Sequence, residues 1–239
     1  MKQILLLVLI TPLYVISQTK NVINSTRITP RPDKVLEFEK ALSDHASKYH
    51  KGDFKWRVYM VRSGPDFGSY QLVEGPYSWD ELDQRGDLGS EHMSDWYRTV
   101  LALCTSAGTN TYSTFREDLS TVALTEYSDK VSSTHYFPKP GCGPRFEALI
   151  KKLNTVWAGS NQLAAVYESS ASGPTQFTVV TRYKTGWKER APEFMKPMRV
   201  RYDTKFGSGG YDALLAEVHE VLDHAWSEMM IYRPDLSSK

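Results

Sequence analysis

Polar side chains with useful chemistry recur in segments of this sequence that are predicted to be β-strands. Arg27 and His135 take equivalent places in two such segments, 108 residues apart. An arginine in a dry pocket fixes an anionic group through charge-assisted hydrogen bonds, whereas a histidine or glutamate can move a proton. The strand residues that join them in the candidate lining are Arg57, Tyr59, Glu74, Tyr167, Glu168 and Arg182. The alternative is that these side chains point to solvent at strand ends or form ion pairs.

Aromatic residues gather in the first half of the chain. They are Trp56, Tyr59, Trp79, Trp96 and Tyr97. Aromatic side chains commonly line the pockets that hold organic ligands. We therefore expect a small, partly aromatic or anionic organic molecule as the partner, with Trp79 among the residues that contact it.

A polar cluster near the C-terminus raises the question of a metal site. His219, Glu220, Asp223 and His224 fall on one stripe of a predicted helix, and pairs four residues apart can chelate an ion. No third ligand follows with suitable spacing, so a solvated helix face explains the cluster better. We expect no metal site from the sequence.

The chain repeats itself, which is the strongest signal in the sequence. Four motifs of the first half return in the same order in the second: Pro30-Arg31-Pro32 with Phe38-Glu39 as Pro138-Lys139-Pro140 with Phe146-Glu147, Ser63-Gly64-Pro65 as Ser172-Gly173-Pro174, Trp79 as Trp187, and Arg116-Glu117-Asp118-Leu119-Ser120 as Arg233-Pro234-Asp235-Leu236-Ser237. The last pair is displaced by nine residues more than the first, which places an insertion in the second half between Trp187 and Arg233.

Both halves predict the same order of elements. Strands are expected at residues 21–29, 54–61, 70–73 and 109–116 and again at 130–137, 163–168, 177–182 and 227–233, with helices at 34–49, 90–104, 144–157 and 211–225. This β-α-β-β-α-β order is that of the ferredoxin-like unit, an α+β module with a four-stranded antiparallel sheet and two helices on one face. The strands are apolar in both phases, so we expect the sheet of one half to cover the sheet of the other.

On these features the chain resembles the dimeric α/β-barrel superfamily, in particular fused two-module members related to NIPSNAP-like and antibiotic-biosynthesis-monooxygenase-like proteins. The resemblance spans residues 21–237 and rests on the element order, on Phe38-Glu39 and Phe146-Glu147, and on Trp79 and Trp187 after each third strand. It implies one chain that forms an intramolecular dimeric α/β barrel, a monomer with a pseudo-twofold axis.

The resemblance leaves the activity open, because the superfamily includes cofactor-free monooxygenases, haem-degrading enzymes, isomerases and proteins of no known activity. We favour a ligand-binding protein without a cofactor, and a cofactor-independent monooxygenase or haem-handling enzyme is the alternative. Haem-binding relatives ligate iron through a helix histidine near the place of His92. The second half has no matching histidine. The haem pattern of these relatives also includes an asparagine in the first strand, and only Asn21 and Asn24 could take that place.

The N-terminus has the three-part pattern of a secretory signal, with charge at Lys2, an apolar run over residues 4–16 and a cleavage site after Ser17. We therefore expect a signal peptide at 1–17, modules at 18–121 and 122–239, and a periplasmic or secreted protein without a membrane span. A net charge of +1 favours no nucleic-acid partner. An oxidising compartment permits a bridge between Cys104 and Cys142, and two separate thiols are the alternative.

Overall fold

The computed structural model describes residues 18–239, so the predicted signal peptide lies outside the described residues. The strands are β1 (Val22–Ile28), β2 (Trp56–Val61), β3 (Tyr70–Tyr77), β4 (Thr109–Phe115), β5 (Lys130–Pro138), β6 (Leu163–Ser169), β7 (Phe177–Tyr183) and β8 (Leu222–Tyr232). The helices are α1 (Val35–Tyr49), α2 (Trp79–Gln84), α3 (Gly89–Asp95), α4 (Gly143–Gly159), α5 (Met198–Phe206) and α6 (Gly210–Val221). Within the described part, none of the helices is long and apolar enough to cross a membrane.

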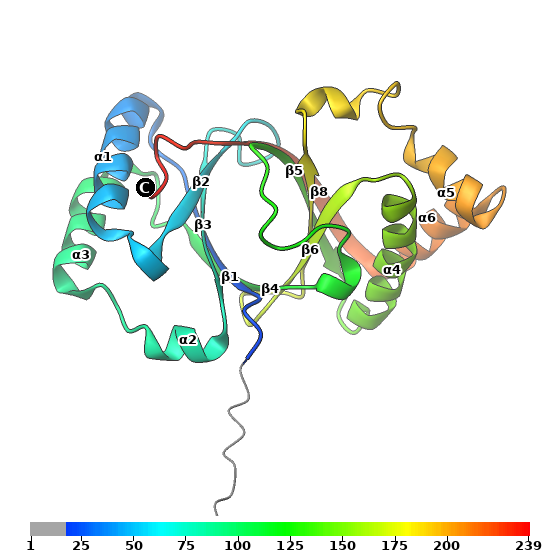
Figure 1. Ribbon diagram of the computed structural model, residues 1–239, viewed down its shortest axis with the longest axis horizontal. Helices are drawn as coiled ribbons and strands as arrows, with labels where there is room; N and C mark the ends of the chain where they lie inside the picture. The colour runs from blue at the N-terminus through cyan, green and yellow to red at the C-terminus, as the bar shows by residue number, and fades with distance from the viewer. Residues whose placement is uncertain (1–17) are drawn as a thin grey trace, which may run out of the picture.

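The eight strands form one closed barrel in the order β1-β3-β2-β8-β5-β7-β6-β4. Each half contributes a complete four-stranded sheet, and the two sheets join edge to edge where β2 pairs with β8 and β4 pairs with β6. The helices of the two halves lie on opposite outer sides of the barrel, α1 to α3 on one and α4 to α6 on the other (Figure 1). The prediction of two ferredoxin-like modules that build an intramolecular dimeric α/β barrel is confirmed.

Strand β2 shows how the sequence builds two layers. Trp56 and Val58 pack with Phe38 under helix α1, whereas Tyr59 and Val61, in the opposite phase, cluster with residues from across the barrel. Alternating side chains leave a strand on opposite faces, so a strand that is apolar in both phases must be covered on both sides. Helices cover the outer face, and barrel closure covers the inner one.

The repeated Phe-Glu and Arg-x-Asp motifs form two equivalent ion pairs that tie the halves together. Arg116, which follows β4, reaches Glu147 in α4 of the second half with a nitrogen–oxygen distance of 3.0 Å. Arg233, which follows β8, contacts both carboxylate oxygens of Glu39 in α1 of the first half. Hydrogen bonds from Arg116 hold the pKa of Glu147 at about 2, and those from Arg233 lower the pKa of Glu39. Both copies of the repeated motifs therefore form the same ion pair between the two halves.

The segment that follows each of these arginines inserts a leucine into the hydrophobic core of the opposite half. Leu119, from the end of the first half, is fully buried in the helix-side core of the second half together with Phe146. Leu236, from the end of the second half, is buried in the core of the first half together with Phe38. Each module therefore has a complete hydrophobic core only in the presence of the other.

Two predicted helix boundaries are wrong. The helix predicted at 211–225 ends at Val221, and β8 begins at Leu222, because residues 222–226 pair with β5. The helix predicted at 90–104 changes its hydrogen bonding after Asp95 into a π-helical segment (Trp96–Val100) and then a 3-10 turn (Leu101–Leu103). Tertiary pairing and packing override local helix propensity at both places.

The insertion in the second half carries an element that the sequence analysis did not predict. It contains helix α5, and the glycine-rich run 207–210 that follows it is a tight connection to α6. Gly207 and Gly209 have φ values of 92° and 81°, which residues with a Cβ rarely adopt. The glycines therefore serve the turn between two helices.

The two cysteines are free thiols in different halves of the molecule. Cys104 follows the 3-10 turn and pairs its backbone with Pro30 through an isolated β-bridge. Cys142 precedes helix α4. Burial raises the pKa of Cys104 to about 11, so its thiol is protonated and unreactive near neutral pH.

Candidate functional site

The barrel encloses a cavity of about 260 Å³, to which all eight strands contribute side chains. Its wall combines apolar and aromatic side chains, such as Val73, Val131, Val180 and Trp226, with hydroxyl, amide and charged side chains. A cavity lined by apolar side chains together with inward-pointing polar groups is the usual form of a small-molecule site.

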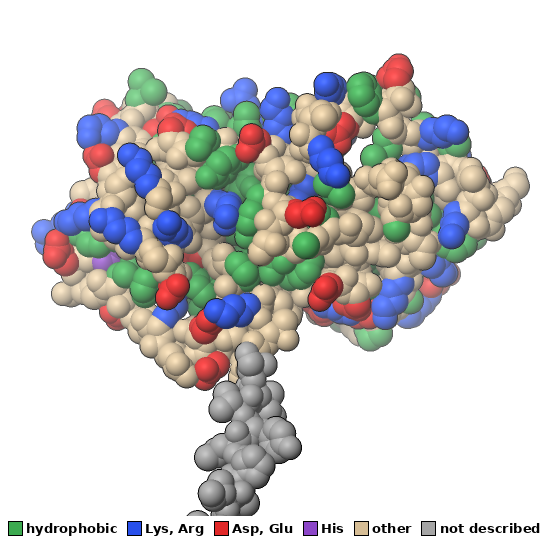
Figure 2. All heavy atoms as spheres, viewed as in Figure 1, with side chains coloured by type: hydrophobic (Ala, Val, Ile, Leu, Met, Phe, Trp, Pro, Cys, Tyr) green, Lys and Arg blue, Asp and Glu red, His purple; other side chains and the backbone are tan. Residues whose placement is uncertain are grey.

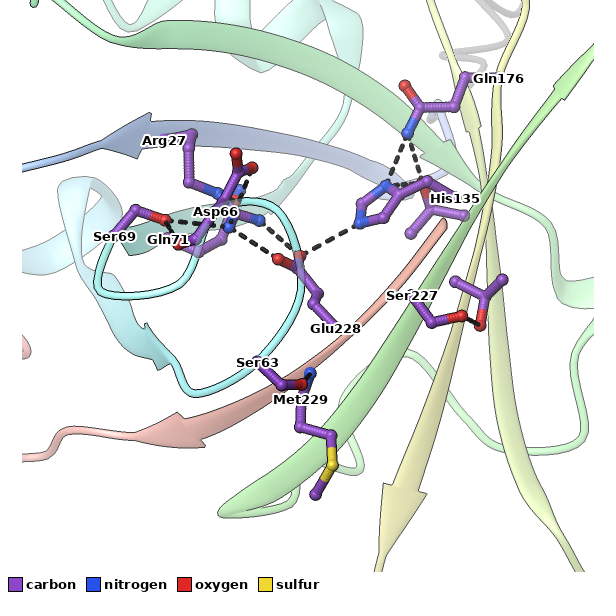
Figure 3. Close-up of polar contacts among 12 residues, drawn as sticks. Arg27, Ser63, Asp66, Ser69, Gln71, His135, Gln176, Ser227, Glu228 and Met229 are labelled. Carbon is purple, nitrogen blue, oxygen red and sulfur yellow. Dashed lines mark hydrogen bonds and ion pairs between the residues drawn. The ribbon is translucent and has the colours of Figure 1, made fainter. Parts of the chain in front are cut away.

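A buried triad of charged and polar groups lies within the barrel. Glu228 of β8 is 1% exposed and accepts hydrogen bonds from Arg27 of β1 at 2.6 and 2.9 Å. His135 of β5 approaches Glu228 from the other side, with its Nε2 atom 3.1 Å from the carboxylate (Figure 3). Gln71 and Ser69 accept further hydrogen bonds from Arg27 and hold its guanidinium in place.

Hydrogen bonds define the tautomer of His135. The side-chain amide of Gln176 donates to Nδ1 at 2.8 Å, so Nδ1 carries a lone pair and the proton resides on Nε2, which donates to Glu228. The indole of Trp226 stacks on the imidazole with 4.0 Å between ring centroids. A histidine whose Nε2 is held by a carboxylate and whose Nδ1 lone pair meets only an amide that a ligand can displace has the arrangement of an oriented general base.

Glu228 keeps its negative charge in this dry environment. Burial alone raises its pKa, but hydrogen bonds from His135 and Arg27, together with the positive charge of Arg27, outweigh burial and the pKa lies below its ordinary value. The charged carboxylate accepts hydrogen bonds from both Arg27 and His135 and so fixes the orientation of the imidazole.

The far end of the cavity is closed by the segment that connects the two halves. The ring of Tyr127 in this segment lies under the guanidinium of Arg57, 3.5 Å from its central carbon. Arg182 donates hydrogen bonds to the carbonyl oxygens of Ala123 and Leu124 at 2.8 and 3.2 Å and thereby fixes the connection across the barrel mouth. Tyr59 donates to another carbonyl of the same segment, that of Ser128.

Six of the residues predicted from the sequence line this cavity: Arg27, Arg57, Tyr59, His135, Tyr167 and Arg182. The others, Glu74, Trp79, His92 and Glu168, are not among the residues that line it. Trp79 is 43% exposed at the start of α2, whereas its repeat equivalent Trp187 is half-buried. Glu74 and His92 lie outside the barrel, next to His50.

Glu228, Gln176, Tyr127 and Trp226 also line the cavity and were not predicted from the sequence. A signal for Glu228 was present, because it shares a phase with Met230 in the predicted strand 227–233 and a carboxylate in an apolar phase is informative. Register also shows that the site is asymmetric. Ser133 pairs with Glu228, whereas the equivalent Ser25 pairs with Thr111, so the first half has a hydroxyl where the second half has the carboxylate.

The comparisons with known proteins agree with the barrel architecture. No family model matches the chain, and no curated protein matches it by sequence. Among solved structures it is similar to an anthrone oxidase-like protein, with a TM-score of 0.56 and 14% identity over 90% of this chain and 92% of that one. It is also similar to a candidate monooxygenase from Fusobacterium nucleatum, with a TM-score of 0.54 and 11% identity over 88% and 91% of the two chains.

A third similar structure, a candidate monooxygenase from Lactobacillus acidophilus, has a TM-score of 0.53 and 12% identity over 91% of this chain and 95% of that one. Identities this low show a shared fold and leave the activity to be argued from the site. With its two ferredoxin-like modules closed into one eight-stranded barrel, the chain has the fold of the dimeric α/β-barrel superfamily.

Proposed function

We propose that this protein binds a small aromatic molecule with an anionic group inside its barrel. The single observation that carries the proposal is the cavity, which has apolar and aromatic residues in its wall and one cationic group free to meet a ligand. Arg27 is neutralised by Glu228, and Arg182 is occupied by carbonyl oxygens. Among residues 18–239, the guanidinium of Arg57 has a cation–π contact with Tyr127 but neither an ion pair nor a hydrogen bond.

The free guanidinium favours an anionic ligand. A half-buried arginine without a carboxylate gains a charge-assisted hydrogen bond when an anion enters, and this partly offsets the cost of its burial. Tyr59, Tyr127 and Tyr167 surround the cavity with aromatic faces and hydroxyl groups. Its volume of about 260 Å³ lies just under the usual range of about 300–1,000 Å³ for ligand pockets, which favours a ligand of one or two rings.

The proposal includes an extracytoplasmic location and a monomeric state. The apolar N-terminal run supports export. Closure of the barrel within a single chain supports a monomer, because within residues 18–239 every strand has two neighbours and no sheet edge is left for a second copy. Basic and acidic side chains are interspersed on the face that Figure 2 shows, in line with the small net charge.

Calorimetric titration with one- and two-ring aromatic carboxylates, and with the matching neutral alcohols, tests the proposal. We expect carboxylates to bind at least about tenfold more tightly than alcohols, and Arg57→Gln to remove this preference, because a hydrogen bond to a charged group contributes about 1.5–3 kcal/mol. Arg199→Gln is the matched control, since Arg199 pairs with Asp212 at the surface. Equal affinities of wild type and Arg57→Gln for the carboxylates would contradict the proposal.

A second function, removal of a proton from a bound phenol or enol, is favoured by the pairing of His135 with Glu228. Nδ1 of His135 can take the proton when the ligand displaces the amide of Gln176, and Glu228 then stabilises the imidazolium through Nε2. Arg27 keeps the carboxylate in position. Deprotonation makes an aromatic ring electron-rich, which is the state that dioxygen oxidises, and it is the type of step that an oxidase without a cofactor needs.

Oxygen uptake in the presence of an anthrone tests this second function. The substrate class is taken from the anthrone oxidase-like protein of the same fold. We expect His135→Gln to slow uptake by about 10²–10⁴-fold, the usual contribution of a general base. His219→Gln, which changes an exposed histidine of α6, is expected to match wild type. If wild type and His135→Gln consume oxygen equally, the His135–Glu228 pair is not catalytic.

Haem fits the described residues poorly. The one histidine among the cavity-lining residues, His135, has both ring nitrogens engaged. His92, the residue that the resemblance suggested as an iron ligand, is outside the barrel and faces other histidines. A cavity of about 260 Å³ is also small for a porphyrin. We therefore base no step on haem.

A further inference from the structure

Three histidines meet on the outer side of the first module, away from the barrel cavity. His45 lies in the last turns of α1, His50 directly follows that helix, and His92 belongs to α3. One ring nitrogen from each lies within 4.8 Å of the other two. The cluster rests against Trp56 of β2, on which the His50 ring stacks with 3.4 Å between centroids.

The outer nitrogens of two of these rings are held by oxygen acceptors. Nδ1 of His45 is 2.6 Å from a carboxylate oxygen of Asp95. Nδ1 of His50 is 2.9 Å from the carbonyl oxygen of Phe54 and 3.2 Å from Glu74. In the neutral rings the proton therefore resides on Nδ1, and Nε2 of both residues presents a lone pair.

His45 Nε2 is the informative atom of the cluster. His45 is 1% exposed, and within the described chain its Nε2 is buried without a hydrogen-bond partner. A hydrogen bond from His92 to His50, whose Nε2 atoms are 3.4 Å apart, leaves this lone pair unsatisfied. An unsatisfied buried acceptor is destabilising and rare in folded proteins, so its presence calls for a partner. A cation placed between the three rings would satisfy all of them.

We infer that His45, His50 and His92 form a binding site for a divalent transition metal, with Zn²⁺ as the expected ion. Zn²⁺ binds histidine nitrogen at about 2.0–2.1 Å in tetrahedral geometry, which puts neighbouring ligand atoms about 3.4 Å apart. The Nε2 atoms of His50 and His92 are already separated by 3.4 Å. Imidazole ligands suit zinc, copper and nickel and disfavour Mg²⁺ and Ca²⁺, which prefer oxygen.

The surroundings have the form of a metal site's outer shell. Histidine ligands usually donate their second N–H to a carboxylate or a backbone carbonyl, which orients the ring and strengthens the ligand. Asp95 does this for His45, and Phe54 with Glu74 does it for His50. Glu74 is held in turn by Arg85 at 3.1 Å. His92 is half-buried, so water can reach the fourth position of the ion.

Binding of zinc to the full chain, expressed without a histidine tag and treated with a chelator, tests the inference. We expect calorimetry to show one Zn²⁺ per chain and Zn²⁺ to raise the melting temperature, because it binds the folded state. His92→Ala is the first variant, since a half-buried residue can be replaced without opening the core. It is expected to lower the zinc affinity by more than tenfold and to abolish the rise in melting temperature. Asp95→Asn is expected to lower the affinity about 10–100-fold.

His219→Ala is the matched control and should bind zinc as wild type does, because His219 is an exposed histidine of α6. Co²⁺ offers an independent readout, since its visible spectrum distinguishes a four-coordinate site from the six-coordinate aqueous ion. The inference is overturned if no zinc binds stoichiometrically, if His92→Ala binds as tightly as wild type, or if bound Co²⁺ keeps its six-coordinate spectrum.

Discussion

Replacing Glu228 by alanine is expected to lower the free energy of unfolding by about 3–5 kcal/mol, because it removes the buried partner of Arg27 and leaves only the more exposed Asp66, 3.5 Å away, to balance its charge. The Glu228 side chain is fully buried and that of Arg27 is 14% exposed. Water can therefore replace few of the hydrogen bonds that Arg27 donates to the carboxylate. His135 loses its hydrogen-bond partner in the same step. Urea denaturation followed by circular dichroism measures the effect.

Thr111→Ala is the matched control for Glu228→Ala. Thr111 occupies the equivalent register position in β4 and has no ion-pair or side-chain hydrogen-bond partner within residues 18–239. We expect a change of about 1 kcal/mol or less, as for a typical substitution. A second check is the double variant Arg27→Met with Glu228→Met, which removes both charges and should be less destabilised than Glu228→Ala alone. If Glu228→Ala costs no more than Thr111→Ala, the buried ion pair does not have the energetic role assigned to it.

The pH dependence of Glu228 has a defined sign. Its pKa is lower in the folded protein than in the unfolded chain, where it is near 4.5. The ion pair therefore contributes its full stability above about pH 4.5, and this contribution is lost as the pH falls through the folded-state pKa. Glu228→Ala should accordingly show a shallower acid transition than wild type.

Truncating the exchanged leucines is expected to have the second large effect. Leu119→Ala and Leu236→Ala should each cost about 2–5 kcal/mol, the usual range for a fully buried leucine. Leu119 is 0% exposed and Leu236 is 3% exposed, and each fills the core of the opposite module. Because each module's core is completed by the other, we expect a single cooperative unfolding transition for both variants.

Leu36→Ala is the control for the exchanged leucines, because Leu36 is 82% exposed on α1. Its replacement should change the unfolding free energy by no more than about 0.5 kcal/mol. A result in which Leu236→Ala is also near neutral would show that the C-terminal segment does not pack into the first module. Two separate transitions would show that the modules fold independently.

The sequence predicts the α+β modules well, since hydrophobic periodicity and an internal repeat are local properties of the chain. Both modules show the same order of strands and helices, and the apolar character of β2 in both phases already required cover on both faces. Helix ends were less predictable. Residues 222–226 were expected to continue a helix, but pairing with β5, more than 80 residues earlier in the chain, makes them a strand.

The site was predicted in part for a similar reason. Arg27 and His135 stand out because the repeat aligns them, and period-two alternation places them on the inner face. No local pattern shows that Arg27 is neutralised by Glu228 while Arg57 is not. Charge pairing between residues 201 positions apart depends on barrel closure. Only the structure therefore shows that Arg57, and not Arg27, is available to an anionic ligand.

The histidine cluster shows this limit most clearly. His45 and His50 are five residues apart, which does not match the three- or four-residue spacing of a chelating pair on a helix, and His92 is 42 residues further along the chain. His50 contributes because the chain leaves helical geometry at that residue, with φ −93° and ψ 79°.

The sequence by itself determined the two-module fold, the periodicity of its strands and some of the polar residues that face the barrel, because these depend on neighbours within one or two turns or strands. Only the tertiary structure decided which sheet edges join, which charges neutralise each other and which histidines meet. Such contacts form between segments far apart in the chain, and their free energy depends on burial and distance, which local residue patterns do not encode.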